Sequence, residues 1–226
     1  MSPTTPHGSH EPTTPQLYEI TMGYGPNDEV WPVTLLNTAL SFARVADAAV
    51  ARLGQISSAT TEGLTILFLL AQSIELALKT FLLISLEQSC PPDENGPHDH
   101  QKSREHQQAL KAIGHDLPKA LRAVVAVGFP RPHSSEEKLL VLLNDAYGGR
   151  RRLQYRAPGR RKVPLLRPVR ELAQQYLTEV HRAATGTVVD PCQVPGLGVD
   201  PAADYGAMTL EQFRLTAQSA PGLGDL

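Results

Sequence analysis

The sequence has few cysteines and few aromatic residues. Only two cysteines occur among 226 residues, and Phe, Trp and Tyr together make up 5%. A secreted, disulfide-stapled scaffold is therefore excluded, and we expect a cytoplasmic protein with a core of Leu, Ala, Val and Ile. The first residues show no basic region followed by an apolar one, so no secretory signal is expected. With 41% hydrophobic residues, one domain of this size needs no disulfide, metal or cofactor to fold.

Acidic residues are absent from residues 150–170, although the whole chain has 23 of them against 21 Lys and Arg. This segment contains nine basic side chains: Arg150, Arg151, Arg152, Arg156, Arg160, Arg161, Lys162, Arg167 and Arg170. The rest of the chain is correspondingly acidic. This asymmetry favours an anionic partner at one place over a protein that coats nucleic acid along its whole surface.

Strand-like alternation is also absent, and the apolar periodicity is helical. We predict an all-α bundle of four or five helices over residues 32–186. It is preceded by a disordered leader (1–31) and followed by a Pro/Gly-rich tail (187–226) with a short helix near 209–218. The helical segments are expected at about 33–53, 62–88, 105–113, 117–128, 136–147 and 168–184.

Capping residues mark several helix ends. Gly54 is expected to end the first helix. Asp116 is expected to cap the helix that has Pro118 in its first turn. Ser134 with Glu137 three residues later is a capping-box pattern for the helix that follows.

The most apolar segment, Leu64–Leu86, is long enough at 23 residues to cross a bilayer. However, Gln72, Glu75 and Lys79 lie near its middle, where polar and ionisable groups are costly in lipid. Flanking basic residues and an aromatic belt are missing. We therefore interpret the segment as the central helix of a bundle and expect no membrane partner.

Two polar features stand out in the helical region. Glu75 and Lys79 are four residues apart, so they share one face of a helix, either as an ion pair at the solvent boundary or as a polar patch in a groove. His115 lies in the sequence Gly114-His115-Asp116-Leu117 at a helix start. The residue types favour a histidine bonded to the local backbone, and the alternative is an imidazole directed toward a neighbouring element.

A histidine cluster precedes these residues. His98, His100 and His106, with Asp99 and Cys90 nearby, have spacings that could bind zinc. The segment looks like a Pro/Gly-rich loop without a rigid element to fix the geometry, so we interpret it as a solvated loop and predict no metal site.

The arginine-rich segment is the strongest functional feature. Guanidinium groups bind phosphate in a bidentate manner, and a cluster of them gives salt-dependent affinity for a polyanion. Tyr147 and Tyr155 flank Arg150–Arg152 and could stack on bases. A solvated basic loop neutralised by the acidic remainder of the protein is the alternative.

Three segments together resemble the HEPN family (higher eukaryotes and prokaryotes nucleotide-binding). They are AQSIELALKTFL (71–82), GHDLPKAL (114–121), and LNDAY (143–147) leading to RLQYR (152–156). The resemblance covers about residues 60–160. It implies a small cytoplasmic helical bundle, usually a homodimer, linked to RNA or nucleotide binding in bacterial defence or toxin–antitoxin systems.

Many HEPN proteins are metal-independent ribonucleases whose signature is an Arg followed by a His four to six residues later. This sequence departs from that pattern, because the first histidine after the arginines is His181. Without that general base, standard HEPN catalysis is not expected. The leading hypothesis is a module that binds RNA or a nucleotide phosphate. The binding residues would be Arg150, Arg151, Arg152, Tyr155 and Arg156, and the polar groove residues Glu75, Lys79, His115, Asp116 and Tyr147.

Two alternatives stay open. The first is a divergent metal-independent endoribonuclease in which Arg152 or Arg156 stabilises the phosphorane and His115 transfers the proton. The second is a non-catalytic bundle whose arginines contact an acidic protein, such as an antitoxin or a nucleotidyltransferase partner.

Overall fold

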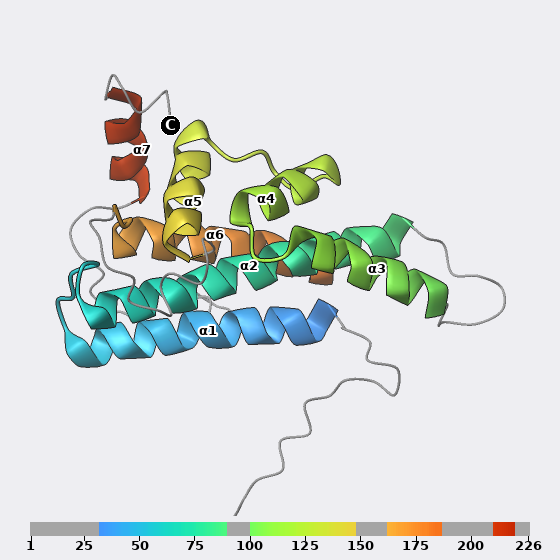
Figure 1. Cartoon of the computed structure of the whole chain (residues 1–226), viewed down its shortest axis with the longest axis horizontal. Coiled ribbons are helices and arrows are strands. Elements are labelled where there is room, and N and C mark those ends of the chain that lie inside the picture. Colours follow the sequence, from blue (N-terminus) through green and yellow to red (C-terminus); the bar gives the residue numbers. More distant parts are fainter. Residues whose placement is uncertain (1–31, 90–99, 148–161, 187–209, 220–226) are drawn as a thin grey trace, which may run out of the picture.

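The computed structural model describes residues 32–89, 100–147, 162–186 and 210–219. Its helices are α1 (Pro32–Leu53), α2 (Thr61–Ser89), α3 (His100–Ile113), α4 (Leu117–Ala126), α5 (Ser134–Tyr147), α6 (Leu166–Thr185) and α7 (Leu210–Ser219) (Figure 1). The predicted all-α bundle is confirmed. The described residues form seven helices, which correspond to the six expected helical segments and to the short helix expected near 209–218. The expected count of four or five helices for the bundle was therefore too low.

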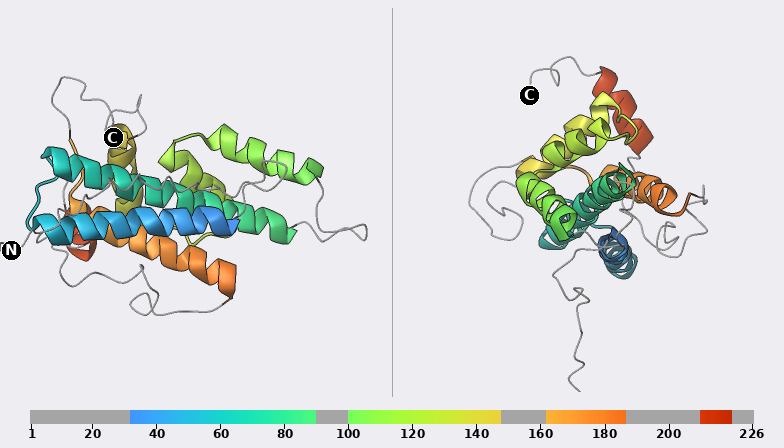
Figure 2. Two further views of the ribbon diagram at one scale, coloured as in Figure 1. Left: turned by 90° about the horizontal axis from the view of Figure 1, so that it is seen from below. Right: turned by 90° about the vertical axis from the view of Figure 1, so that its right-hand side faces the viewer.

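Helix α2 is the centre of the bundle. Helices α1 and α6 lie along it, α3 and α4 cover another side, and α5 stands across it (Figures 1 and 2). Helix α7 packs against α5 and α6. Leu67, Leu70, Ile74 and Leu78 on α2 are fully buried. Complete burial of one such side chain contributes about 1.5–3 kcal/mol. This surrounding of α2 explains why it is apolar on nearly all sides.

The turn from α1 to α2 depends on two glycines. Gly54 has a φ of 73° and donates its N–H to the Val50 carbonyl at 2.9 Å, so it ends α1 as predicted. Gly63 lies so close to the turn that an added Cβ would be 2.1 Å from the Ser57 carbonyl oxygen. Thr60 caps α2 by accepting the Gly63 N–H at 3.1 Å. The close approach of turn and helix therefore requires glycine at position 63.

A buried ion pair joins α1 to α6. Arg170 donates through Nε to Asp47 Oδ1 at 2.5 Å and through Nη2 to Asp47 Oδ2 at 2.6 Å. The Arg170 residue is 2% exposed. Arg167 pairs with Glu171 at 3.1 Å. Arg170 therefore does not contribute to a basic surface for an anionic partner, because it neutralises an aspartate inside the bundle.

The start of α5 differs from the predicted capping box by one residue. The carboxylate of Glu136, not that of Glu137, accepts the backbone N–H of the residue preceding the helix, His133, at 3.1 Å. Glu136 also pairs with Arg214 of α7. Within the part of the chain that the structure describes, the buried Ser135 hydroxyl has no hydrogen-bond partner. Because Glu136 contacts both His133, just before α5, and Arg214 of α7, tertiary packing favours the Glu136–His133 hydrogen bond over the predicted pairing of Ser134 with Glu137.

The predicted loop before α3 is shorter than expected. Helix α3 begins at His100 rather than near residue 105, so His100 and His106 lie on a helix. Cys90, His98 and Asp99 lie outside the described residues. In the described parts of the chain, no group of three or more His, Cys, Asp or Glu residues is arranged to hold a metal ion.

Helices α1 and α2 are both long and apolar enough to cross a membrane by length and composition alone. Of the most apolar 18-residue stretch of α2, 72% is buried inside the bundle, against 39% of the corresponding stretch of α1. The core helix of a soluble bundle passes the same test, so these two helices are weak evidence for a membrane span.

Candidate functional site

A buried carboxylate on α2 organises the principal polar cluster of the bundle. Glu75 is 2% exposed. Its Oε1 accepts from Lys79 Nζ at 2.6 Å, and its Oε2 accepts from the Tyr147 hydroxyl at 2.6 Å. His115 Nδ1 lies 3.1 Å from both carboxylate oxygens. Charge-assisted hydrogen bonds of this kind compensate the cost of burying the carboxylate. We call Glu75, Lys79, His115 and Tyr147 the Glu75 cluster.

Three elements contribute to the Glu75 cluster. Central helix α2 provides Glu75 and Lys79, the turn between α3 and α4 provides His115, and Tyr147 is the last residue of α5. Four of the five residues predicted for the polar groove therefore meet at one carboxylate. For Glu75 and Lys79 the structure favours the polar patch over a simple pair at the solvent boundary. For His115 it favours the contact with a neighbouring helix over a bond to the local backbone.

Asp116, the fifth predicted residue, has a different place. Its Oδ1 accepts the Lys119 N–H at 2.9 Å, so it is the N-cap of α4, as the sequence predicts for that helix start. Gly114 precedes His115 with a φ of 63°, a conformation that glycine adopts easily. Asp116 thus contributes to the site indirectly, because it fixes the turn that carries His115.

Asn144 ties this turn to α5. Its Oδ1 accepts the Leu117 N–H at 3.0 Å, which satisfies an amide at the start of α4 that no helical bond can satisfy. The same helix ends three residues later at Tyr147. Sequence reasoning did not assign a role to Asn144. The only signal was its place in the LNDAY segment, where Asn in a helix interior is an unfavourable choice.

The Tyr147 hydroxyl is a fixed donor. Gln72 Nε2 donates to it, and it donates to Glu75. Its ring packs against Phe68, with centroids 5.6 Å apart, and lies edge-on to His115 at 6.4 Å. Burial, followed by the charge and hydrogen bond of Glu75, raises the pKa of Tyr147 far above its usual value. The phenol therefore stays protonated at neutral pH. Gln72 was the other participant that sequence reasoning did not assign to the site.

Exposure increases across the Glu75 cluster. The Glu75 side chain is 3% exposed, that of Lys79 13% and that of His115 60%. Because Nδ1 of His115 faces the carboxylate, the Nε2 edge of the ring is on the open side. A carboxylate that holds one imidazole nitrogen leaves the other free to donate or accept a proton, or to bind an anion when the ring is charged.

The predicted phosphate-binding residues lie outside the described part of the chain. This applies to Arg150, Arg151, Arg152, Tyr155 and Arg156, the arginines proposed for catalysis among them. The described residues end at Tyr147 and resume at Lys162. The structure therefore locates the Glu75 cluster and the point at which the chain leaves it toward the arginines.

Fold and site together define an all-α bundle with a polar cluster built on a buried glutamate of its central helix. In comparisons with protein-family models, with curated proteins and with solved structures, no match to this chain was found. The HEPN resemblance accordingly stays a prediction that rests on its three sequence motifs.

Proposed function

We propose that this protein is a HEPN-like module that binds RNA or a nucleotide phosphate beside the Glu75 cluster. The observation that carries the proposal is the convergence of Lys79, His115 and Tyr147 on Glu75. Tyr147 is also the residue from which the chain continues to Arg150–Arg156. The three motifs behind the family resemblance each supply part of this cluster.

The charges of the cluster suit a neighbouring anion. Glu75 is buried and has Lys79 as its counterion, so its negative charge is screened from the surface. The exposed member is His115, a potential donor. An anionic ligand near His115 would thus meet donors first and the carboxylate only behind them.

The positive charge that phosphate binding requires comes from the arginines. Arg150 follows Tyr147 by three residues, and three residues of fully extended chain span at most about 11 Å. Connectivity alone therefore ties the first arginine to the neighbourhood of the cluster. Four guanidinium groups on a single-stranded RNA give a salt dependence of log K on log [salt] with a slope of about −3.

The test is RNA binding measured by fluorescence anisotropy over a series of salt concentrations. We expect Arg151→Ala/Arg152→Ala to weaken binding and to reduce the salt slope by roughly half. Arg52→Ala/Arg182→Ala, which removes two exposed arginines from α1 and α6, is the matched control and should leave the slope nearly unchanged. Salt-insensitive binding, or equal effects of both double variants, would contradict the proposal. Binding of a protein partner without RNA affinity would favour the protein-interaction alternative.

A second function, metal-independent endoribonuclease activity, is favoured by the contact between His115 and Glu75. In this reaction His115 Nε2 would take the proton of the ribose 2′-hydroxyl while its oxygen attacks the adjacent phosphorus. Arg152 or Arg156 would stabilise the phosphorane charge. The P–O5′ bond would then break, with a proton delivered to the leaving oxygen, leaving a 2′,3′-cyclic phosphate.

Cleavage of RNA in excess EDTA tests this second function. Products with 2′,3′-cyclic phosphate ends, lost in His115→Ala and Arg152→Ala, would establish the nuclease. His133→Ala, at an exposed histidine preceding α5, is the control and should retain full activity. Intact RNA with wild-type protein would leave binding as the function.

The resemblance also makes the homodimer and the bacterial toxin–antitoxin or defence setting part of the proposal. Light scattering coupled to gel filtration gives the mass of the assembly, and a value near 24.5 kDa would contradict the dimer.

A further inference from the structure

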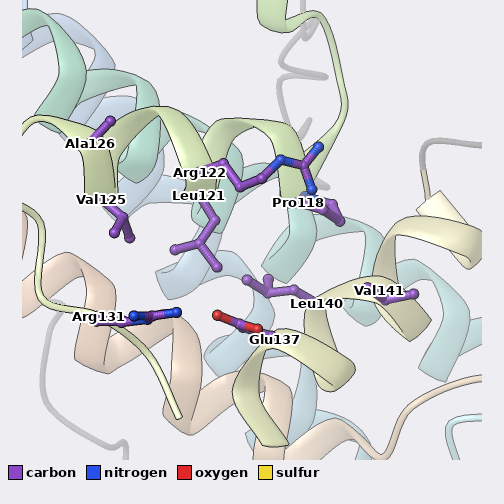
Figure 3. Close-up of a pocket in the computed structure, with 9 residues that line it drawn as sticks. All are labelled: Pro118, Leu121, Arg122, Val125, Ala126, Arg131, Glu137, Leu140 and Val141. Carbon is purple, nitrogen blue, oxygen red and sulfur yellow. The ribbon is translucent and has the colours of Figure 1, made fainter. Parts of the chain in front are cut away.

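A pocket of about 460 Å³ lies between α4 and α5 and shares no residue with the Glu75 cluster. Leu121 and Val125 of α4 and Leu140 and Val141 of α5 provide apolar walls (Figure 3). Volumes of about 300–1,000 Å³ with mostly apolar walls and a few polar groups are typical of small-molecule sites. The pocket is thus the right size and chemistry for an organic ligand rather than for a single ion.

Charged side chains occupy two sides of the pocket. Figure 3 shows Arg131 and Glu137 pointing toward one another on one side, while Arg122 extends toward Pro118 on the other. Among the described residues, Arg122 has no ion-pair or hydrogen-bond partner. Arg131 has no such partner among them either, but Figure 3 shows the Glu137 carboxylate directed toward Arg131 and no acid among the labelled residues beside Arg122. Arg122 is therefore the cation farther from the acid of the pocket and the one that an incoming anion meets.

The backbone that carries Arg131 is restrained. Arg131 lies between Pro130 and Pro132. A proline fixes its own φ, and the residue before a proline is confined to extended conformations. The backbone of the loop from α4 to α5 therefore gives this wall of the pocket little conformational freedom, which reduces the entropy lost when a ligand binds.

We propose that the pocket binds a small amphipathic organic anion, with an aromatic or alkyl body between α4 and α5 and its anionic group on Arg122. A helical segment of a protein partner fits less well, because α4 has ten residues and is only about 15 Å long. The proposal goes beyond RNA binding, and the pocket shares no residue with the turn that carries His115.

A pair of matched probes tests this assignment. 1-Anilinonaphthalene-8-sulfonate carries one anionic group, and 1-anilinonaphthalene lacks it. We expect saturable fluorescence enhancement with the sulfonate. Arg122→Ala should weaken its binding about tenfold, the effect of losing one charge-assisted hydrogen bond. Glu137→Gln should tighten it a few-fold, because it removes the acid of the pocket.

The neutral probe and three further variants make the test specific. Neither Arg122→Ala nor Glu137→Gln should change the affinity for 1-anilinonaphthalene. Val125→Trp, which fills the pocket, should abolish binding of both probes, and Arg52→Ala on α1 should affect neither. Thermal unfolding followed by circular dichroism shows whether each variant is folded. If Val125→Trp does not fold, Val141→Trp fills the pocket from α5 in its place.

Several results would overturn the proposal. Absence of saturable binding to the wild-type protein would do so, as would equal effects of Arg122→Ala on both probes. An RNA oligonucleotide that displaced the sulfonate in a competitive manner would assign the pocket to the RNA site. RNA binding could be absent while the probes bind as expected, and RNA could bind while the probes do not. The RNA proposal and the pocket proposal are therefore tested separately.

Discussion

His115 Nδ1 lies 3.1 Å from both carboxylate oxygens of Glu75, which is forty residues earlier in the sequence. This contact joins the α3–α4 turn to the centre of α2. The His115 side chain is 60% exposed and the Glu75 side chain 3%, so the contact crosses the boundary between solvent and core. The carboxylate can therefore determine the orientation of the imidazole while the imidazole remains accessible.

Glu75→Gln should destabilise the fold by about 1–3 kcal/mol, because Lys79 and Tyr147 would lose their charged acceptor in a buried setting. The measurement is the free energy of unfolding in urea. Glu105→Gln, at an exposed position of α3, is the control and should change it by less than about 0.5 kcal/mol. A Glu75→Gln variant as stable as the control would show that the cluster contributes to site geometry alone.

The Asp47–Arg170 pair predicts an asymmetry between single and double replacement. Asp47→Leu or Arg170→Met alone leaves one charge buried without its counterion and should cost about 3–5 kcal/mol. The double variant replaces both charges with apolar groups of comparable volume and should recover most of that loss. Thermal unfolding of the four proteins gives the coupling energy. Additive losses would mean that the two side chains act independently.

Alkaline stability should depend on Tyr147 and Tyr176. Burial raises the pKa of both phenols well above the value of 10 that they have in an unfolded chain, and nearby glutamates add to the shift. A raised folded-state pKa means that this contribution to stability is fully present below pH 10 and is lost as pH rises above it. Absorbance at 295 nm should show these two tyrosines ionising together with unfolding.

Tyr147→Phe supplies the control for this titration. The variant should have one tyrosine fewer in the ionisation step that accompanies unfolding, and the rest of the titration should be unchanged. Ionisation of Tyr147 near pH 10 in the folded protein would contradict the contact with Glu75. The variant also loses the hydrogen bond to Glu75, so it should be less stable than the wild type at neutral pH.

Much of the fold could be predicted from local signals. Apolar periodicity located α2 within one residue of its observed ends, and proline and glycine marked most of the breaks. Asp116 was predicted as an N-cap from its position before Leu117-Pro118. These features depend on interactions between residues close in sequence, which is why the sequence alone contains them.

The remaining features depend on distant partners. Arg170 is the last of the nine basic residues in a stretch that contains no acid, yet Asp47 on α1 neutralises it. Gln72 and Asn144 are ordinary polar residues until α2, α4 and α5 bring them to Tyr147 and Leu117. The periodicity of one helix cannot identify a contact that forms only when another helix packs against it.

The C-terminal helix gives the last prediction. Arg214 of α7 pairs with Glu136 at the start of α5 and donates to Gln175 on α6 at 3.1 Å. Because Glu136 is 1% exposed, Arg214→Ala would leave a buried carboxylate whose one remaining donor among the described residues is the His133 amide. We expect faster hydrogen exchange at the start of α5 and in α7. Arg182→Ala, which breaks an exposed pair with Glu179 within α6, should leave exchange there unchanged. Equal exchange in both variants would mean that α7 is held by apolar contacts such as Leu210, and the ion pair would then be incidental to its docking.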